Sequence, residues 1–235
     1  MPHPQGLFGR SETALLVVDM QNAFCDLRGG FAEAGRDVSA QHGIIPLVGR
    51  IVDAAHRAGI LVAWTIQEGL GAHDRARLTR SIPRILGRPD AGIPESWCIR
   101  NTWDAEIVAE LAEHVRASDF VVHKLRMSAF YSTTLDGLLR IRQIRSLIVV
   151  GVNTEKCVES TVREASFRDY DVVVVGDAVA TTDPRFHDDS LAKIDLYFGS
   201  VLPSEIVLDA LVELDGVQAG GTTGRSRYEG RSGSM

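Results

Sequence analysis

Three residues of reactive type stand at, or shortly after, the ends of short apolar runs. Asp19 occurs in ALLVVDMQNAF, Lys124 in DFVVHKLRMSAF and Cys157 in GVNTEKCVESTVREA. A thiol can attack a carbonyl carbon, a carboxylate can accept and return the thiol proton, and an ammonium can orient that carboxylate. Together, the three side chains would form a nucleophilic catalytic set.

Each of the three residues also has a plainer interpretation. A cysteine near a helix start is commonly a small packed side chain. An aspartate after a strand commonly caps a helix, and a lysine there commonly extends into solvent. The catalytic interpretation therefore depends on elements that deliver all three side chains to one place.

The position of Cys157 favours reactivity. Helical spacing begins near Glu155, so Cys157 is expected in the first turn of a helix. The positive end of the helix dipole predicts a lowered thiol pKa. The unpaired N–H groups of that turn could hold the oxyanion that forms when sulfur attacks a carbonyl.

Apolar runs rich in β-branched residues alternate with segments of helical spacing. This alternation predicts a doubly wound, mostly parallel α/β sheet, in which ligands bind beyond the carboxyl ends of the strands. The expected strands are Ala14–Val18, Ile60–Ile66, Asp119–His123, Ser146–Val152 and Asp171–Val175. The expected helices are His42–Ala58, Asp104–His114, Leu135–Arg142, Glu155–Asp169 and Asp188–Tyr197.

The chain is predicted to contain one domain, residues 13–214. Residues 1–12 are expected to form an N-terminal leader. Residues 215–235, rich in glycine and serine, are expected to form a flexible tail. The stretch Glu68–Thr102, rich in Gly, Pro and Arg, is expected to be a long functional loop.

Composition excludes several classes of protein. With 25 Lys and Arg against 31 Asp and Glu, the net charge is −6 and no basic block occurs, so neither nucleic acid nor a membrane is an expected partner. The first ten residues lack the features of a signal peptide, which predicts a cytoplasmic protein. Three widely spaced cysteines fit no disulfide framework. No GxGxxG follows the first strand and no GxxxxGK[ST] occurs, so no cofactor is predicted.

Three sequence blocks carry a family resemblance. They are LLVVDMQNAF, the K-x-R-x-S-A-F block from Lys124 to Phe130, and the G-V-x-T-x-x-C-V-E-S-T block from Gly151 to Thr161. With these blocks the sequence, from Ala14 to about Leu211, resembles the isochorismatase-like cysteine hydrolases. The last two blocks are most similar to the ureidoacrylate amidohydrolase branch. The resemblance implies a three-layer α/β/α sandwich, as the strand pattern also indicates.

The resemblance implies roles for individual residues. It makes Asp19, Lys124 and Cys157 a catalytic triad, places a cis peptide bond between Val152 and Asn153, and makes the backbone N–H groups of Asn153 and Cys157 the oxyanion hole. The side chains expected to line the substrate pocket are Phe24, Gln67, Trp103 and Tyr131. Arg100 is a further candidate, because a substrate carboxylate needs a cationic group. A solvated loop arginine is the alternative interpretation.

Departures from the family pattern narrow the chemistry. The stretch after the second strand, TIQEGLGAHDR, contains His73 alone, so no metal site is expected. The presence of Cys157 argues against the vinyl-ether cleavage of true isochorismatases. Asn153 and Glu155 differ from the residues expected in relatives, and Leu125 replaces a proline. Ile194 stands near the position of a glutamine in biuret hydrolases, which disfavours biuret.

The leading hypothesis is a cysteine amidohydrolase that cleaves a linear ureido or carbamoyl C–N bond through a thioester and releases ammonia. The candidate substrates are ureidoacrylate, triuret and N-carbamoyl compounds. One alternative is a family amidase acting on a carboxamide such as maleamate or a ring carboxamide. Another is a non-catalytic α/β interaction module. A small-molecule substrate and a homo-oligomer, either dimer or tetramer, are the expected partners, with helices after Asp136 and Glu155 as candidate interfaces.

Overall fold

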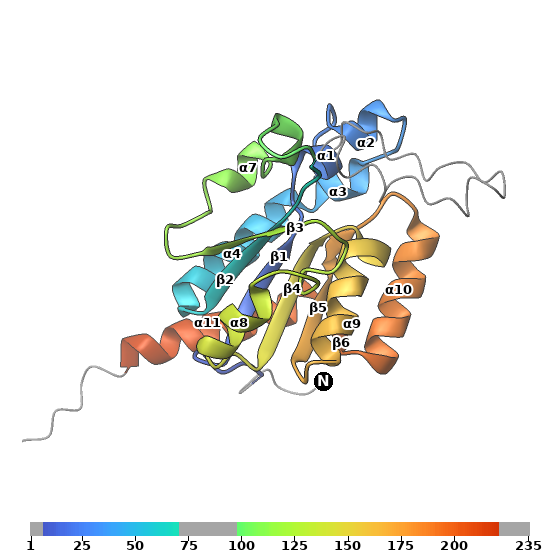
Figure 1. Ribbon diagram of the computed structural model, residues 1–235. Helices are drawn as coiled ribbons and strands as arrows, with labels where there is room; N and C mark the ends of the chain where they lie inside the picture. The colour runs from blue at the N-terminus through green and yellow to red at the C-terminus, as the bar shows by residue number, and fades with distance from the viewer. Residues whose placement is uncertain (1–6, 71–97, 221–235) are drawn as a thin grey trace, which may run out of the picture.

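A computed structural model describes residues 7–70 and 98–220 of the chain, and these form a six-stranded sheet between two layers of helices (Figure 1). Every strand pairing in the sheet is parallel, in the order β3-β2-β1-β4-β5-β6. The strands are β1 (Thr13–Val18), β2 (Leu61–Gln67), β3 (Phe120–Lys124), β4 (Ser146–Val152), β5 (Asp171–Ala180) and β6 (Ser200–Leu202). The predicted three-layer α/β/α fold class is confirmed.

The strand order changes direction between β1 and β4. The chain runs outward from β1 through β2 to β3 and then returns to place β4 on the other side of β1. Ligands of doubly wound sheets bind at such a switch point, beyond the carboxyl ends of the strands. Asp19 follows β1 directly, and Cys157 follows β4 by five residues.

Helices cover both faces of the sheet. Those before β2 are α1 (Asn22–Cys25), α2 (Gly30–Glu33), α3 (Ser39–Gly43) and α4 (Ile45–Ala58). Those after β2 are the 3-10 turn η2 (Trp103–Ala105), α7 (Ala109–Ala112), α8 (Leu135–Ile141), the π-helical turn η3 (Thr154–Val158), α9 (Glu159–Ser166), α10 (Pro184–Tyr197) and α11 (Ser204–Gly220).

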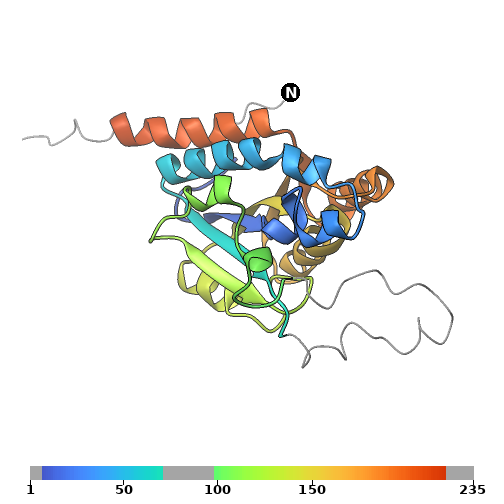
Figure 2. The same cartoon turned by 90° about the horizontal axis from the view of Figure 1, so that it is seen from above.

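Alternation along each strand divides the core between the two faces. In β1, Leu15 and Val17 pack in the cluster that contains α4 and α11, whereas Leu16 and Val18 pack in the cluster that contains α8 and α9. Figure 2 shows α11 lying alongside α4 on the first face. All six residues of β1 are buried, as expected for a central strand covered on both sides.

Helix α4 illustrates how local sequence sets an element's limits. A proline stands in its first turn, where the missing N–H costs nothing. Val48, Ile51, Val52 and Ala55 recur at helical spacing and are fully buried. Gly59 then ends the helix in the left-handed conformation, at φ 69°.

The five predicted strands are present within a few residues of their expected limits. Strand β5 continues to Ala180, past the expected end at Val175, and β3 ends on Lys124 rather than before it. The three-residue strand β6 was not predicted, because so short a segment carries no periodicity.

The expected helix Asp104–His114 is wrong. Only η2 and α7 are helical there, because the residues between them pair with the chain after β1 instead. The N–H of Asn22 donates to the carbonyl of Glu106, and the N–H of Val108 donates to the carbonyl of Met20. A local pattern cannot show such a long-range pairing.

Four other helix predictions differ in extent. His42–Ala58 is divided into α3 and α4 at Ile44, and Leu135–Arg142 ends one residue early. The segment Glu155–Asp169 begins as the π turn η3 and ends at Ser166, while α10 begins at Pro184. Helices α1, α2 and α11 were not predicted.

Described residues lie on both sides of the expected domain, and its limits stay a prediction. Phe8 is buried in the core, and the Arg10 guanidinium donates to the carbonyl of Leu214. Helix α11 continues to Gly220, past the expected start of the tail at residue 215. The rest of the predicted tail, residues 221–235, lies outside the described residues, as does most of the predicted loop, residues 71–97.

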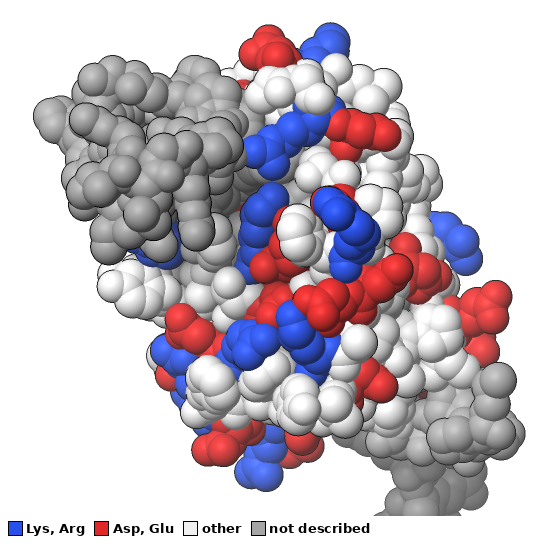
Figure 3. Space-filling view, turned by 90° about the vertical axis from the view of Figure 1, so that its right-hand side faces the viewer, with Lys and Arg blue, Asp and Glu red and all other residues white. Residues whose placement is uncertain are grey.

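Two features of the described residues concern membranes and charged partners. None of the helices in the described part of the chain is long and apolar enough to cross a membrane. On the face of the molecule seen in Figure 3, acidic and basic side chains are interspersed.

Gly151 allows the close approach of β4 to β1. Its φ is 116°, and a Cβ atom there would lie 2.1 Å from the carbonyl oxygen of Val18. We expect Gly151→Ala to lower the free energy of unfolding by about 3 kcal/mol or more, because backbone must move. Urea unfolding measures the change.

Gly137 provides the matched control. It lies in α8, and a Cβ atom added there would meet nothing within 4 Å beyond the helix itself, so Gly137→Ala should stabilise the chain by roughly 0.5–1 kcal/mol. Equal effects of the two substitutions would contradict the packing role of Gly151.

Candidate active site

Asp19 is fixed immediately beyond the carboxyl end of β1. Its φ of 51° turns the chain out of the strand, and its side chain is fully buried. The hydroxyl of Thr65 on the neighbouring strand β2 donates to Asp19 Oδ1 at 2.6 Å. One carboxylate oxygen is therefore held by a neutral donor, which leaves Oδ2 for the other groups of the site.

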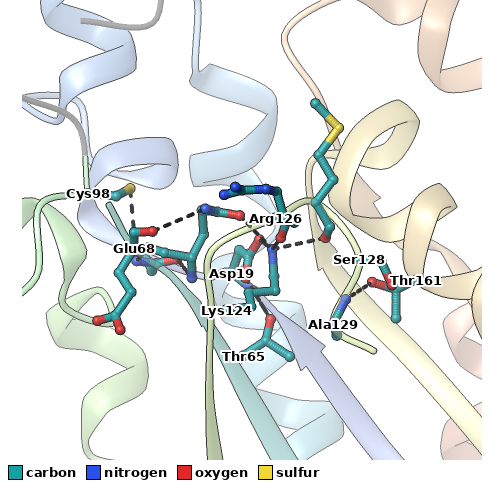
Figure 4. A network of polar contacts seen from close by, with 12 residues as sticks. Asp19, Thr65, Glu68, Cys98, Lys124, Arg126, Ser128, Ala129 and Thr161 are labelled. Atoms are coloured by element: carbon teal, nitrogen blue, oxygen red, sulfur yellow. Dashed lines mark hydrogen bonds and ion pairs between the residues drawn. The ribbon is translucent and has the colours of Figure 1, made fainter. Parts of the chain in front are cut away.

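Lys124 reaches this carboxylate from β3, across the width of β2. Its Nζ lies 2.7 Å from Asp19 Oδ2, and neither side chain has any exposed surface. The ammonium also donates to Gln67 Oε1 at 3.0 Å and to the carbonyls of Arg126 at 3.1 Å and Met127 at 3.0 Å. Figure 4 shows Lys124 between Asp19 and the loop that carries Arg126.

The Lys124 ammonium remains charged in this buried position. Burial by itself lowers the pKa of Lys124, but the charges and hydrogen bonds of Asp19 and Cys157 raise that pKa by more, so it lies above its ordinary value. Lys124 therefore supplies a permanent positive charge and is poorly suited to donate a proton.

Cys157 completes the cluster from the other side of the switch point. Its thiol interacts electrostatically with both Asp19 and Lys124. It lies in the buried turn η3, and only 6% of the residue is exposed. The structure thus brings together the three residues on which the predicted triad depends.

The expected lowering of the Cys157 pKa is wrong for the free chain. Burial raises the pKa of this thiol to about 12, and Asp19 adds to the rise, while Lys124 opposes it. Removal from water raises this pKa by more than the nearby Lys124 charge lowers it. The resting group is a thiol, so its proton must pass to a base before sulfur can attack.

Asn153 links β4 to the turn that presents Cys157. The peptide bond between Val152 and Asn153 is cis, as the family resemblance implies. The Asn153 carbonyl accepts from the N–H of Lys156 at 3.1 Å and from the N–H of Val158 at 3.2 Å. Its buried side-chain oxygen accepts from Gln41 Nε2 at 3.1 Å. The oxyanion role of the Asn153 and Cys157 N–H groups stays a prediction.

The side chains expected to line a substrate pocket differ from one another in burial and in their contacts. Phe24 is buried in α1 and packs edge-to-face against Phe31, with 4.9 Å between the two ring centres. Gln67 holds Lys124, which makes it part of the polar network. Trp103 and Tyr131 are 43% and 57% exposed, and the Arg28 guanidinium lies 5.4 Å from the Trp103 ring centre.

Arg100 already has an acidic partner. Its Nε donates to Glu68 Oε1 at 2.8 Å, and the Glu68 side chain is buried. Glu68 also binds His123 Nδ1 at 3.2 Å. A substrate carboxylate would have to compete with this buried glutamate for Arg100. His123 is exposed whereas Lys124 is buried, in keeping with the alternation of side chains along β3.

Sequence reasoning missed the neutral side chains that support the site. Thr65 was detectable in principle, because parallel pairing sets it opposite Val18, next to Asp19. Gln21 was harder to find. Its amide accepts from the N–H of Gln67 and donates to the carbonyls of Gln67 and Ala105, which fixes the end of β2. Nothing in the sequence around Gln41 indicates its role, since Asn153, which it contacts, lies 112 residues further along the chain.

The described residues include no group of three or more His, Cys, Asp and Glu side chains placed to hold a metal ion. His73, the imidazole considered in the sequence, lies outside those residues. The free cysteines Cys25 and Cys98 are both buried.

Comparison with known proteins agrees with this architecture. The isochorismatase domain profile matches residues 13–206. The chain is 36% identical over 203 residues to the ureidoacrylate amidohydrolase RutB of Enterobacter sp. strain 638, covering 83% of this chain and 86% of that protein. It is 34% identical over 199 residues to RutB of Acinetobacter baylyi, with 81% and 80% coverage.

Two solved structures are similar to the whole domain. A cysteine hydrolase from Pseudomonas syringae pv. phaseolicola matches with a TM-score of 0.74 and 26% identity, covering 91% of this chain and 99% of that one. An N-carbamoylsarcosine amidase from Thermoplasma acidophilum matches with a TM-score of 0.62 and 25% identity, covering 83% and 97%. The chain belongs to the isochorismatase family, which confirms the resemblance found in its motifs.

The buried ion pair makes a testable contribution to stability. Lys124→Met leaves the Asp19 carboxylate buried without its cation, so we expect the free energy of unfolding to fall by about 3–5 kcal/mol in urea titrations. Adding Asp19→Asn to the same chain removes the uncompensated charge and should recover much of this loss. A Lys124→Met chain as stable as the wild type would show that Asp19 is compensated elsewhere.

The raised thiol pKa predicts the pH dependence of alkylation. In the free chain, the iodoacetamide reaction at Cys157 should be slow at pH 7 and should still rise with pH above 9, because only the thiolate reacts. Peptide mass spectrometry after a timed quench measures Cys157 separately from Cys25 and Cys98. A rate that levels off below pH 8 would contradict the raised pKa.

Proposed function

We propose that this protein is a cysteine amidohydrolase that cleaves a linear ureido or carbamoyl C–N bond and releases ammonia. The observation that carries the proposal is the buried ion pair of Asp19 and Lys124 in contact with the Cys157 thiol. The names of the relatives point to the same substrate class, since they act on ureidoacrylate and N-carbamoylsarcosine.

In the first half of the reaction, Asp19 takes the thiol proton and the Cys157 sulfur attacks the substrate carbonyl carbon. The N–H groups of Asn153 and Cys157 receive the oxyanion of the tetrahedral intermediate. Asp19 then returns the proton to the leaving nitrogen. The C–N bond breaks, ammonia departs, and the acyl group remains on sulfur as a thioester.

In the second half, water resolves the thioester. Asp19 takes a proton from the water, whose oxygen attacks the thioester carbonyl. The C–S bond breaks, and the proton held by Asp19 returns to the Cys157 sulfur. The product leaves as a carbamic acid, and the resting thiol is restored.

Lys124 acts electrostatically through both halves. Its positive charge, held by Gln67 and two backbone carbonyls, orients Asp19 and favours the transient thiolate that burial disfavours. Because the pKa of Lys124 lies above its ordinary value, the proton transfers belong to Asp19.

The substrate proposed for this site is small. Because Cys157 is almost fully buried in the free chain, only a compact group can bring its carbonyl to the sulfur. Phe24, Trp103 and Tyr131 remain the side chains that we propose to line the approach, with Phe24 the most buried of the three.

Ammonia release from a substrate panel tests the proposal. We expect turnover of ureidoacrylate, triuret or an N-carbamoyl amino acid, and a loss of ~10⁴-fold or more in kcat for Cys157→Ala, because the nucleophile is absent. Early quenching of the wild-type reaction should show an acyl adduct on Cys157 by mass spectrometry.

Cys25→Ala is the control, since this buried cysteine should be dispensable for turnover. Release of ammonia only from nicotinamide or maleamate would move the substrate to another class of carboxamide. Full activity in Cys157→Ala, or no turnover of any amide, would overturn the proposed mechanism.

A further inference from the structure

Asn153 is the point at which several restraints on the nucleophile's turn meet. Its carbonyl accepts from the N–H groups of Lys156 and Val158, the residues on either side of Cys157. Its side chain is buried and bound by Gln41. The Asn153 carbonyl therefore restrains the turn that carries the sulfur. The Asn153 N–H belongs to the preceding peptide bond, and the buried Asn153 side chain, held by Gln41, leaves the Cα between them.

Gln41 approaches Asn153 from a separate part of the fold. It lies in α3, near the carboxyl ends of the strands (Figure 1). The next residue, His42, bonds through Nδ1 to the carbonyl of Cys25 at 3.1 Å, which ties α3 to α1. Helix α1 begins three residues after Asp19. Gln41 thus connects the segment that follows the carboxylate with the turn that carries the thiol.

The Gln41 amide is a poor device for stability alone. The residue has no exposed surface, and its Oε1 has no hydrogen-bond partner among the described residues. A buried carbonyl oxygen without a donor loses its hydration and gains nothing in return. An apolar side chain of the same length would remove this unpaired oxygen but would leave Asn153 Oδ1 without its donor, so the amide brings little net stability.

We propose that Gln41 is a positioning residue that holds the Asn153 side chain and thereby aims the Asn153 N–H at the oxyanion. The inference rests on the proposed function, because an oxyanion forms only if sulfur attacks a carbonyl. A donor that is correctly aimed in advance stabilises the transition state more than the bound substrate. Loss of Gln41 should therefore reduce kcat and leave KM largely unchanged.

The substitution Gln41→Met separates positioning from structural support. Methionine has a similar length, and the exchange replaces one unpaired buried oxygen, Gln41 Oε1, by another, Asn153 Oδ1. We expect kcat for ammonia release to fall ~10-fold, KM to stay within about twofold, and the thermal midpoint to shift by less than about 3 °C.

Alkylation of Cys157 provides a readout that does not require an oxyanion. Iodoacetamide reacts by displacement at a saturated carbon, so the alkylation rate of Gln41→Met should equal that of the wild type. Equal losses in alkylation and turnover would mean that Gln41 positions the thiol instead, which would overturn the inference.

A double-mutant cycle tests whether Gln41 affects kcat through Asn153. Asn153→Ala removes the side chain that Gln41 holds, so adding Gln41→Met to that variant should change kcat no further. A further loss in the double variant would show that Gln41 acts elsewhere. Unchanged kcat in Gln41→Met alone would also refute the role.

Thr13→Val is the matched control. Thr13 Oγ1 is likewise buried and unpaired among the described residues, but it lies at the amino end of β1, away from the site. Thr13→Val should leave kcat unchanged. If the wild-type protein turns over no amide, the proposed function and this inference are both overturned. If the wild-type protein turns over an amide and Gln41→Met does so at the same rate, this inference alone is overturned.

Discussion

The ion pair between Lys124 and Asp19 is the constraint on which the rest of the site depends. Two charges lie fully out of water, which is expensive unless each is matched by a close opposite charge and by hydrogen bonds. Thr65 supplies a donor to the carboxylate, while Gln67 and two backbone carbonyls supply acceptors to the ammonium. The same burial that isolates the pair raises the pKa of Cys157, so the site rests with a thiol beside its base.

Sheet topology makes this convergence possible. The reversal of strand order between β1 and β4 places Asp19 and the turn of Cys157 beyond adjacent strands. Lys124 comes from β3, two strands away from β1, and spans β2 to reach the carboxylate. Gly151 contributes by geometry alone, because any side chain there would collide with the backbone of β1.

Much of the polar structure around the site consists of neutral amides and hydroxyls. Gln21 fixes the end of β2, Gln67 holds the lysine, and Gln41 holds Asn153. Neutral groups can be buried at lower cost than charges and can still direct the groups that react. Each is paired with a residue far along the chain, so the supporting network joins segments that have no local relation.

The sequence by itself determined the fold class, five of the strands and the positions of Asp19, Lys124 and Cys157, because apolar runs and the residues that end them are local features. It did not determine that Arg100 is bound by Glu68, that residues 106–108 pair with the chain after β1, or that burial raises the pKa of Cys157. These outcomes were decided by the tertiary structure alone. Partner choice, strand pairing and loss of water all depend on which distant segments pack together, and no window of sequence contains both sides of such a contact.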